Sequence, residues 1–129
     1  MAKRMTSPLT PAQLEIMNLV WEHGELNVAQ VWKLLADRRP LARNTVQTML
    51  TRLADRGWLV VRAEGKAFYF RAAQPRKSAV RRMMSQLIDS VFEGSASRLV
   101  MALLDNRRLS VAELKRIRKR IDRAERDEQ

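Results

Sequence analysis

Residues 44–71, NTVQTMLTRLADRGWLVVRAEGKAFYFR, decide the fold of this 129-residue chain. At about 100° per residue, a helix over 44–56 gathers its apolar side chains on one face and its polar side chains on the other. Gly57 is the expected C-terminal stop of this helix. Two short aromatic and β-branched runs follow, over 58–62 and 67–71, and the stretch between them is a plausible hairpin turn.

Two further helices are expected before this stretch. Thr10 and Gln13 can form a capping box, and Gly24 ends the first helix. The second begins near Asn27, with Gln30 three positions on, and breaks at 37–40. The side chains expected inside are Leu14, Ile16, Met17, Val20, Val28, Val31, Leu34, Leu35, Trp21, Trp32 and Trp58. Three helices followed by a hairpin is the order of a winged helix-turn-helix, within a mainly α chain.

The C-terminal part predicts a three-helix module. A linker is expected over 74–78, followed by helices over 78–92 and 95–104 and by one that starts at the Ser110 capping box. We therefore expect a DNA-binding domain over 1–74 and a dimerisation domain over 75–129. The candidate dimerisation residues are Val80, Met84, Leu87, Ile88, Val91, Leu99, Leu103, Leu114, Ile117 and Ile121.

A module of about 50 residues buries too little surface to be more than marginally stable alone. Its first helix is apolar over much of its circumference, which requires more than one packing partner. A second copy of the chain supplies that surface, so homodimerisation is the economical interpretation. The alternative is that these helices fold back on the N-terminal domain.

Positive charge is concentrated in the middle third of the chain. The whole chain has 25 Lys and Arg residues against 14 Asp and Glu, a formal net charge of +11. Residues 38–82 hold twelve of the bases but only two of the acids, so they contribute +10. Charges selected for solubility alone are usually interspersed, whereas a concentrated patch favours a polyanion, of which nucleic acid is the commonest. Glu15, Glu22 and Glu25 are expected to be scattered surface acids.

The composition excludes several classes of function. With no cysteine and one histidine, the chain has no disulfide framework, no thiol nucleophile and no cysteine-based metal site. Its four glycines are widely spaced and form no phosphate-cradling loop, so we expect no enzyme activity, no cofactor and no metal. No apolar run approaches the ~20 residues of a membrane span, and the start lacks the apolar segment of a signal peptide. A cytoplasmic protein is expected.

The outer face of the 44–56 helix suits the major groove of DNA, where all base pairs can be distinguished. Gln47 can pair with adenine, arginines can pair with guanine or grip phosphate, and threonines can contact thymine methyl groups. The hairpin brings further groups to the flanking backbone, where contacts position the protein. The candidate DNA-binding residues are Arg43, Asn44, Thr45, Gln47, Thr48, Thr51, Arg52, Arg62, Lys66 and Tyr69.

Residues 9–24, LTPAQLEIMNLVWEHG, and 44–53, NTVQTMLTRL, resemble the penicillinase-repressor (BlaI/MecI/CopY) family. The resemblance continues past the hairpin to Ser110. It implies a dimeric transcriptional repressor with an N-terminal winged helix and a C-terminal helical dimerisation module. It also implies inducible control of antibiotic-response genes, often through a membrane-bound sensor metalloprotease that cleaves the repressor.

The chain departs from this family pattern in two places. The copper-responsive members have a cysteine-rich C-terminal metal motif, which a chain without cysteine cannot form. In the antibiotic-resistance repressors, cleavage is at an Asn-Phe bond, and the matching position here is Ala102-Leu103. The sequence leaves the operator, the regulated genes and the inducing signal open.

Two other partners fit the same charge. An RNA-binding or ribosome-associated winged helix is the main alternative to a DNA-binding repressor. A basic protein on anionic membranes is a weaker alternative, because the basic patch coincides with a hairpin module rather than with an amphipathic helix.

Overall fold

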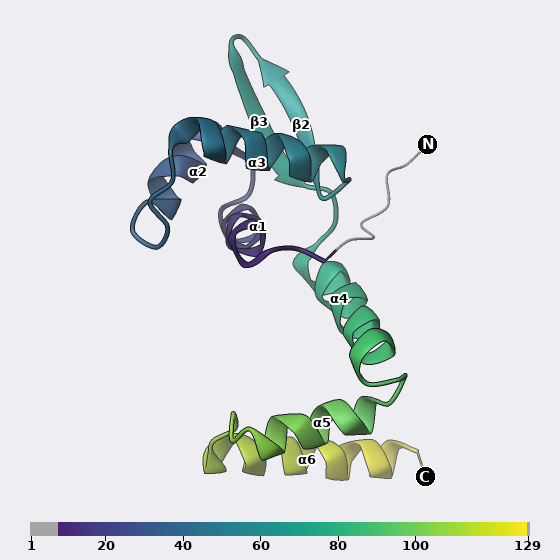
Figure 1. Ribbon diagram of the computed structural model, residues 1–129. Helices are drawn as coiled ribbons and strands as arrows, with labels where there is room; N and C mark the ends of the chain where they lie inside the picture. The colour runs from purple at the N-terminus through teal and green to yellow at the C-terminus, as the bar shows by residue number, and fades with distance from the viewer. Residues whose placement is uncertain (1–7, 129) are drawn as a thin grey trace. The chain divides into compact units, whose positions relative to one another are not determined.

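The computed structural model describes residues 8–128, which form two compact units (Figure 1). The first unit ends at Met83 and the second begins at Met84, so the boundary falls inside a helix. The elements are α1 (Pro11–His23), β1 (Leu26–Asn27), α2 (Val28–Leu35), α3 (Arg43–Asp55), β2 (Leu59–Glu64), β3 (Ala67–Ala72), α4 (Arg76–Val91), α5 (Ala96–Asp105) and α6 (Val111–Asp127). The mainly helical fold with three helices and a hairpin wing is confirmed.

Capping boxes start α1, α2 and α6. In the first, the Thr10 hydroxyl accepts a hydrogen bond from the Gln13 amide at 3.2 Å, and the Gln13 side chain accepts one from the Thr10 amide at 3.0 Å. The other two boxes pair Asn27 with Gln30 and Ser110 with Glu113. Each box satisfies two amides that have no partner inside the helix, so these helices begin where the sequence predicts.

α4 begins two residues earlier than predicted. The expected linker over 74–78 is therefore wrong in its second half, because Arg76 is already helical. The Pro75 carbonyl accepts hydrogen bonds from the amides of Ser78 at 3.1 Å and Ala79 at 3.2 Å. Amides at the start of a helix have no partner inside the helix, so a proline is tolerated there. Pro75 therefore leads directly into the helix instead of separating it from the wing.

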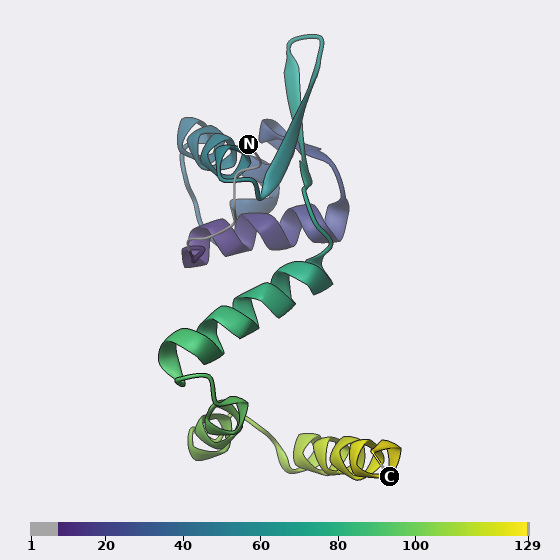
Figure 2. The same cartoon turned by 90° about the vertical axis from the view of Figure 1, so that its right-hand side faces the viewer.

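The hairpin belongs to a three-stranded antiparallel sheet with the strand order β1–β3–β2. Along the β2–β3 pair, Val61 lies opposite Phe70, and β1 adds Leu26 on the other side of Phe70. The sequence missed β1, because two residues are too few to show alternation. Beyond β1, the hairpin continues away from the helices of this unit towards Gly65 at the turn (Figures 1 and 2).

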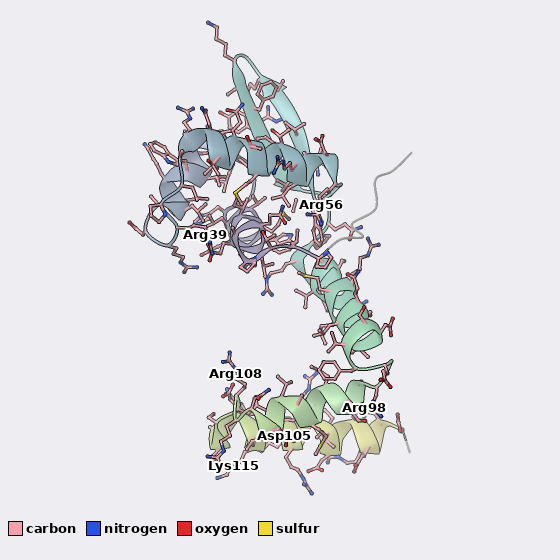
Figure 3. The ribbon with its side chains drawn as sticks, in the orientation of Figure 1. Arg39, Arg56, Arg98, Asp105, Arg108 and Lys115 are labelled. Atoms are coloured by element: carbon pink, nitrogen blue, oxygen red, sulfur yellow. The ribbon has the colours of Figure 1, made fainter. Side chains whose placement is uncertain are left out.

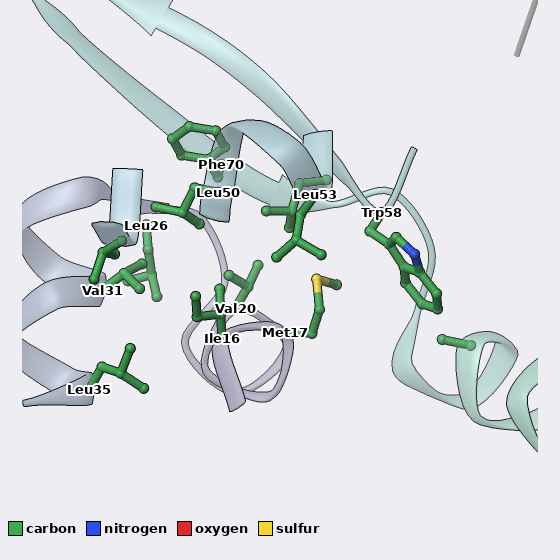
Figure 4. Close-up of a cluster of buried hydrophobic side chains, with 13 residues drawn as sticks. Ile16, Met17, Val20, Leu26, Val31, Leu35, Leu50, Leu53, Trp58 and Phe70 are labelled. Carbon is green, nitrogen blue, oxygen red and sulfur yellow. The ribbon is translucent and has the colours of Figure 1, made fainter. Parts of the chain in front are cut away.

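Side chains from all three helices and from the sheet form the core of the first unit (Figure 4). The buried residues are Ile16, Met17, Val20, Leu26, Val31, Leu35, Val46, Leu50, Leu53, Trp58, Leu59, Phe70 and Ala79. Met83 also packs against this core, so the first turns of α4 stabilise the winged helix.

Two side chains of α2 that the sequence placed inside are on the surface. Trp32 is 38 % exposed and Leu34 is 39 % exposed. α2 has eight residues, and its buried residues are Val31 and Leu35, which lie one turn apart on one face. Trp32 lies beside this face, where its indole nitrogen donates a hydrogen bond to the Leu41 carbonyl at 2.9 Å.

The second unit has no fully buried side chain between residues 84 and 128. Its large apolar side chains are exposed instead, among them Met84, Leu87, Val91, Val100, Met101, Leu103, Leu104, Leu114, Ile117 and Ile121. None of the helices in residues 8–128 combines the length and the apolar character that a membrane crossing requires.

The burial difference between two leucines gives a test of this core. Leu50→Ala should lower the free energy of unfolding by about 2–5 kcal/mol, because it leaves a cavity in place of a fully buried side chain. Leu34→Ala should cost clearly less, because Leu34 is partly solvated already. Urea unfolding of both variants measures the difference, and equal losses would contradict the exposure of Leu34.

Candidate nucleic-acid interface

One face of α3 is buried and the opposite face is open. Val46, Leu50 and Leu53 are completely buried, which turns the polar side chains of this helix outwards. The predicted candidates on α3 are all exposed: Arg43, Asn44, Thr45, Gln47, Thr48, Thr51 and Arg52. Ala42 precedes the helix and gives it no side-chain cap, so the first amides of α3 are available to an anion.

Most of these side chains line one shallow groove along α3. Its volume is about 590 Å³, and its lining residues are Asn44, Gln47, Thr48, Thr51, Arg52 and Asp55. The Thr48 hydroxyl donates to the Asn44 carbonyl at 3.0 Å, and the Thr51 hydroxyl donates to the Gln47 carbonyl at 3.0 Å. Because these hydroxyl hydrogens are engaged, the threonines offer acceptor oxygens and methyl groups, whereas Gln47 and Arg52 offer donors.

A second hollow lies where the wing meets the starts of α2 and α3. Its volume is about 290 Å³, and it is lined by Asn27, Val28, Ala29, Arg43, Gln47, Lys66, Ala67 and Phe68. Gln47 borders both this hollow and the α3 groove, so the two adjoin at this residue. The structure thus brings together Lys66 of the wing, Arg43 and Gln47. All three are candidate DNA-binding residues of the sequence analysis.

Arg62 and Tyr69, the other two wing candidates, are engaged inside the unit. The Arg62 guanidinium contacts Glu25 at 2.6 and 3.1 Å and Glu64 at 2.8 Å. It also lies over the Tyr69 ring, 4.9 Å from the centroid. We call these four residues the Arg62 cluster. Its hydrogen bonds hold the pKa of the Glu25 carboxyl below its ordinary value, although burial opposes this shift.

Two more arginines of the basic segment have partners within the first unit. Arg39, which is labelled in Figure 3, donates hydrogen bonds to both carboxylate oxygens of Glu15 on α1, at 3.0 and 3.3 Å. Arg56 donates to the Gln13 side chain at 3.2 Å and so ties the end of α3 to the start of α1. Glu15 and Glu25, which the sequence placed at the surface, are paired with arginines rather than isolated. Their partners lie 24 and 37 positions away, a distance at which the sequence gives no pairing signal.

A comparison with protein families assigns the chain. The model of the family described as "Penicillinase repressor" matches residues 9–123. The chain belongs to the penicillinase repressor family. Among curated proteins of this family, the penicillinase repressor of Bacillus licheniformis is 27 % identical over 106 residues, which cover 82 % of this chain and 83 % of that protein. The regulatory protein MecI of Mammaliicoccus sciuri is 21 % identical, over 88 % of this chain and 92 % of MecI.

Solved structures support the same assignment. The DNA-binding domain of the repressor BlaI is 31 % identical, with a TM-score of 0.52 over 57 % of this chain and 89 % of that domain. Apo MarR from E. coli has a TM-score of 0.52 at 16 % identity, over 90 % of this chain and 77 % of MarR, a likeness of fold alone. The resemblance to BlaI and MecI and the winged-helix fold are confirmed. The penicillinase repressor family is one of DNA-binding transcriptional regulators and not a class of enzymes.

The Arg62 cluster should loosen in acid. Because the pKa of Glu25 is lowered from its ordinary 4.5, the cluster stabilises the wing above about pH 4.5 and this stabilisation is lost as the pH falls through the lowered pKa. NMR of the Arg62 Nε–H resonance across this range should show the change. Glu25→Gln should remove most of the pH dependence, and a resonance that titrates identically in both proteins would contradict the pairing.

Proposed function

We propose that this chain is a sequence-specific DNA-binding repressor that acts as a homodimer on a dyad-symmetric operator in the cytoplasm. The observation that carries the proposal is the exposed polar face of α3, which is held in place by a buried apolar face and flanked by the cationic side chains of Arg43, Arg52 and Lys66. A helix with this surface fits the major groove, where donors and acceptors identify each base pair.

In this proposal the side chains of α3 divide the work of recognition. Gln47 reads adenine in the major groove, and the methyl groups of Thr48 and Thr51 meet thymine methyl groups. Arg43, Arg52 and Lys66 contact guanine or phosphate, and the uncapped start of α3 holds a phosphate. Arg62 and Tyr69, which the sequence assigned to the flanking backbone, are proposed to position the wing instead.

The homodimer is supported by the second unit. Leu114, Ile117 and Ile121 form an apolar stripe on α6, and each is at least 38 % exposed. A helical unit that buries none of its own side chains needs another surface to be stable, and a second copy offers a matching one. We assign residues 1–74 to DNA binding and 75–129 to dimerisation, with Val80 lying in the part of α4 that belongs to the first unit.

Repression follows from occupancy. A two-fold dimer binds two half-sites about one helical turn or a multiple apart and blocks the polymerase at an overlapping promoter. An inducer that weakens the dimer releases the DNA, because each half binds weakly alone. We propose control of antibiotic-response genes and a membrane-bound sensor protease as the partner that releases the repressor. The bond at the position cleaved in the antibiotic-resistance repressors is Ala102-Leu103, within α5.

Base readout by Gln47 can be tested by one substitution. Gln47→Ala should weaken binding to the true operator by roughly 1–3 kcal/mol and binding to random duplex DNA very little, because only the operator places adenine opposite Gln47. Footprinting on the protein's own upstream region supplies the operator, and titration gives both affinities. Equal losses on the two DNAs would remove Gln47 from base readout.

Dimerisation can be tested by charge on opposite faces of α6. Ile117→Asp should produce monomers and a loss of operator affinity, because it places a carboxylate in the apolar stripe. Lys119→Asp introduces the same carboxylate about 200° around the helix and should leave the dimer intact. Sedimentation equilibrium distinguishes the two, and a dimer that survives Ile117→Asp would overturn the assignment of this stripe.

The polyanion can be identified by salt and by competition. A dimer that neutralises on the order of 8 phosphates should lose about 10³- to 10⁵-fold in affinity between 50 and 200 mM salt. Structured RNA should compete poorly against operator duplex. If it competes better than the duplex, the RNA-binding alternative replaces the repressor.

A further inference from the structure

The two faces of the wing differ in charge and polarity. Residues that lie opposite each other in the β2–β3 pair share a face, and successive residues alternate. One face holds Arg62 opposite Tyr69, and the other holds Ala63 opposite Phe68 and Val61 opposite Phe70. The second of these faces is the one that packs on the core, because Phe70 is only 4 % exposed.

The face with Arg62 is a poor surface for a polyanion. Arg62 contacts two carboxylates, Glu25 and Glu64, and Arg71 lies on the same face, so these four groups together carry no net formal charge. Three of the five N–H groups of the Arg62 guanidinium are engaged by these carboxylates, and a phosphate at Arg62 would also be repelled by both of them. The Arg62 cluster therefore joins the wing to the segment before β1 and leaves DNA contacts to the other face.

The core-facing side of the wing is uncovered towards the turn. Phe70 is buried, but Val61 beside it is 47 % exposed and Phe68, two positions further out, is 52 % exposed. Phe68 lines the 290 Å³ hollow together with the cationic Arg43 and Lys66 and the amide of Gln47. An aromatic ring and two cations in one hollow offer an apolar surface for a deoxyribose and positive charge for the neighbouring phosphates of a DNA strand.

We propose that this hollow binds a sugar–phosphate segment of duplex DNA, with the Phe68 ring against a deoxyribose and with Arg43 and Lys66 on the neighbouring phosphates. The proposal rests on the DNA-binding function proposed above and adds a contact that charge patterning alone does not indicate. Because Gln47 borders both the hollow and the α3 groove, this segment would lie next to the bases that α3 contacts.

A pair of alanine variants tests the contact. Phe68→Ala should weaken binding to operator duplex by roughly 10-fold, through lost apolar contact, and leave the slope of log affinity against log salt unchanged. Val60→Ala is the matched control, because Val60 lies on the other face of the same hairpin and is 38 % exposed. It should change affinity less than 2-fold, whereas Lys66→Ala should lower the salt slope by about one per protomer.

A second measurement follows Phe68 directly and does not depend on the stability of a variant. The chain has three phenylalanines, so 4-fluorophenylalanine labelling gives three ¹⁹F resonances, of which Phe68→Leu identifies one. Operator duplex should shift the Phe68 resonance strongly and that of the buried Phe70 little. Inorganic phosphate at the same phosphate concentration should leave Phe68 unshifted, because it brings no sugar.

The outcomes separate this inference from the proposed function. If the unmodified protein binds duplex and Gln47→Ala discriminates operator from random DNA, the proposed function stands. An unshifted Phe68 resonance, or equal losses for Phe68→Ala and Val60→Ala, would then overturn only the sugar contact. If the unmodified protein binds no duplex, the proposed function falls and the inference falls with it.

Discussion

Val46, Leu50 and Leu53 are completely buried on one side of α3, and this helix cannot rotate about its axis without exposing them. The constraint fixes which side chains face outwards. Gln47, Thr48 and Thr51 line one groove because they lie on the side of the helix opposite the buried residues. The surface that we propose for DNA recognition is therefore a consequence of core packing.

Core packing also determines the two faces of the wing, because successive side chains of a strand point to opposite faces. Phe70 packs on the core and so determines which face of the hairpin points to the core. Phe68 lies on the same face, two residues nearer the turn, where the core no longer covers it. The opposite face is stabilised by polar contacts, since Arg62 joins Glu25, before β1, to Glu64 at the end of β2. One face is thus held by ion pairs, and the other is left with an exposed aromatic ring beside two cations.

The two units are stabilised in different ways. The first has a closed core that includes Ala79 and Met83 from the start of α4. The second has exposed apolar side chains and no fully buried one among residues 84–128, and in the proposed homodimer a second copy covers this apolar surface. In that proposal, dimerisation and the release of DNA can change without unfolding the part of the chain that carries α3.

Short-range patterns of the sequence determined the helices, the hairpin and the exposed face of α3. Capping at Thr10 and the period of the apolar residues act within a turn or two, so the residues themselves carry that information. Only the tertiary structure decided that Trp32 is exposed, that Leu26 joins a third strand and that Arg62 pairs with Glu25. The strand pairing and the ion pair join residues that are 37 or more positions apart. The exposure of Trp32 depends on how few side chains the short helix α2 buries. No local sequence pattern encodes either.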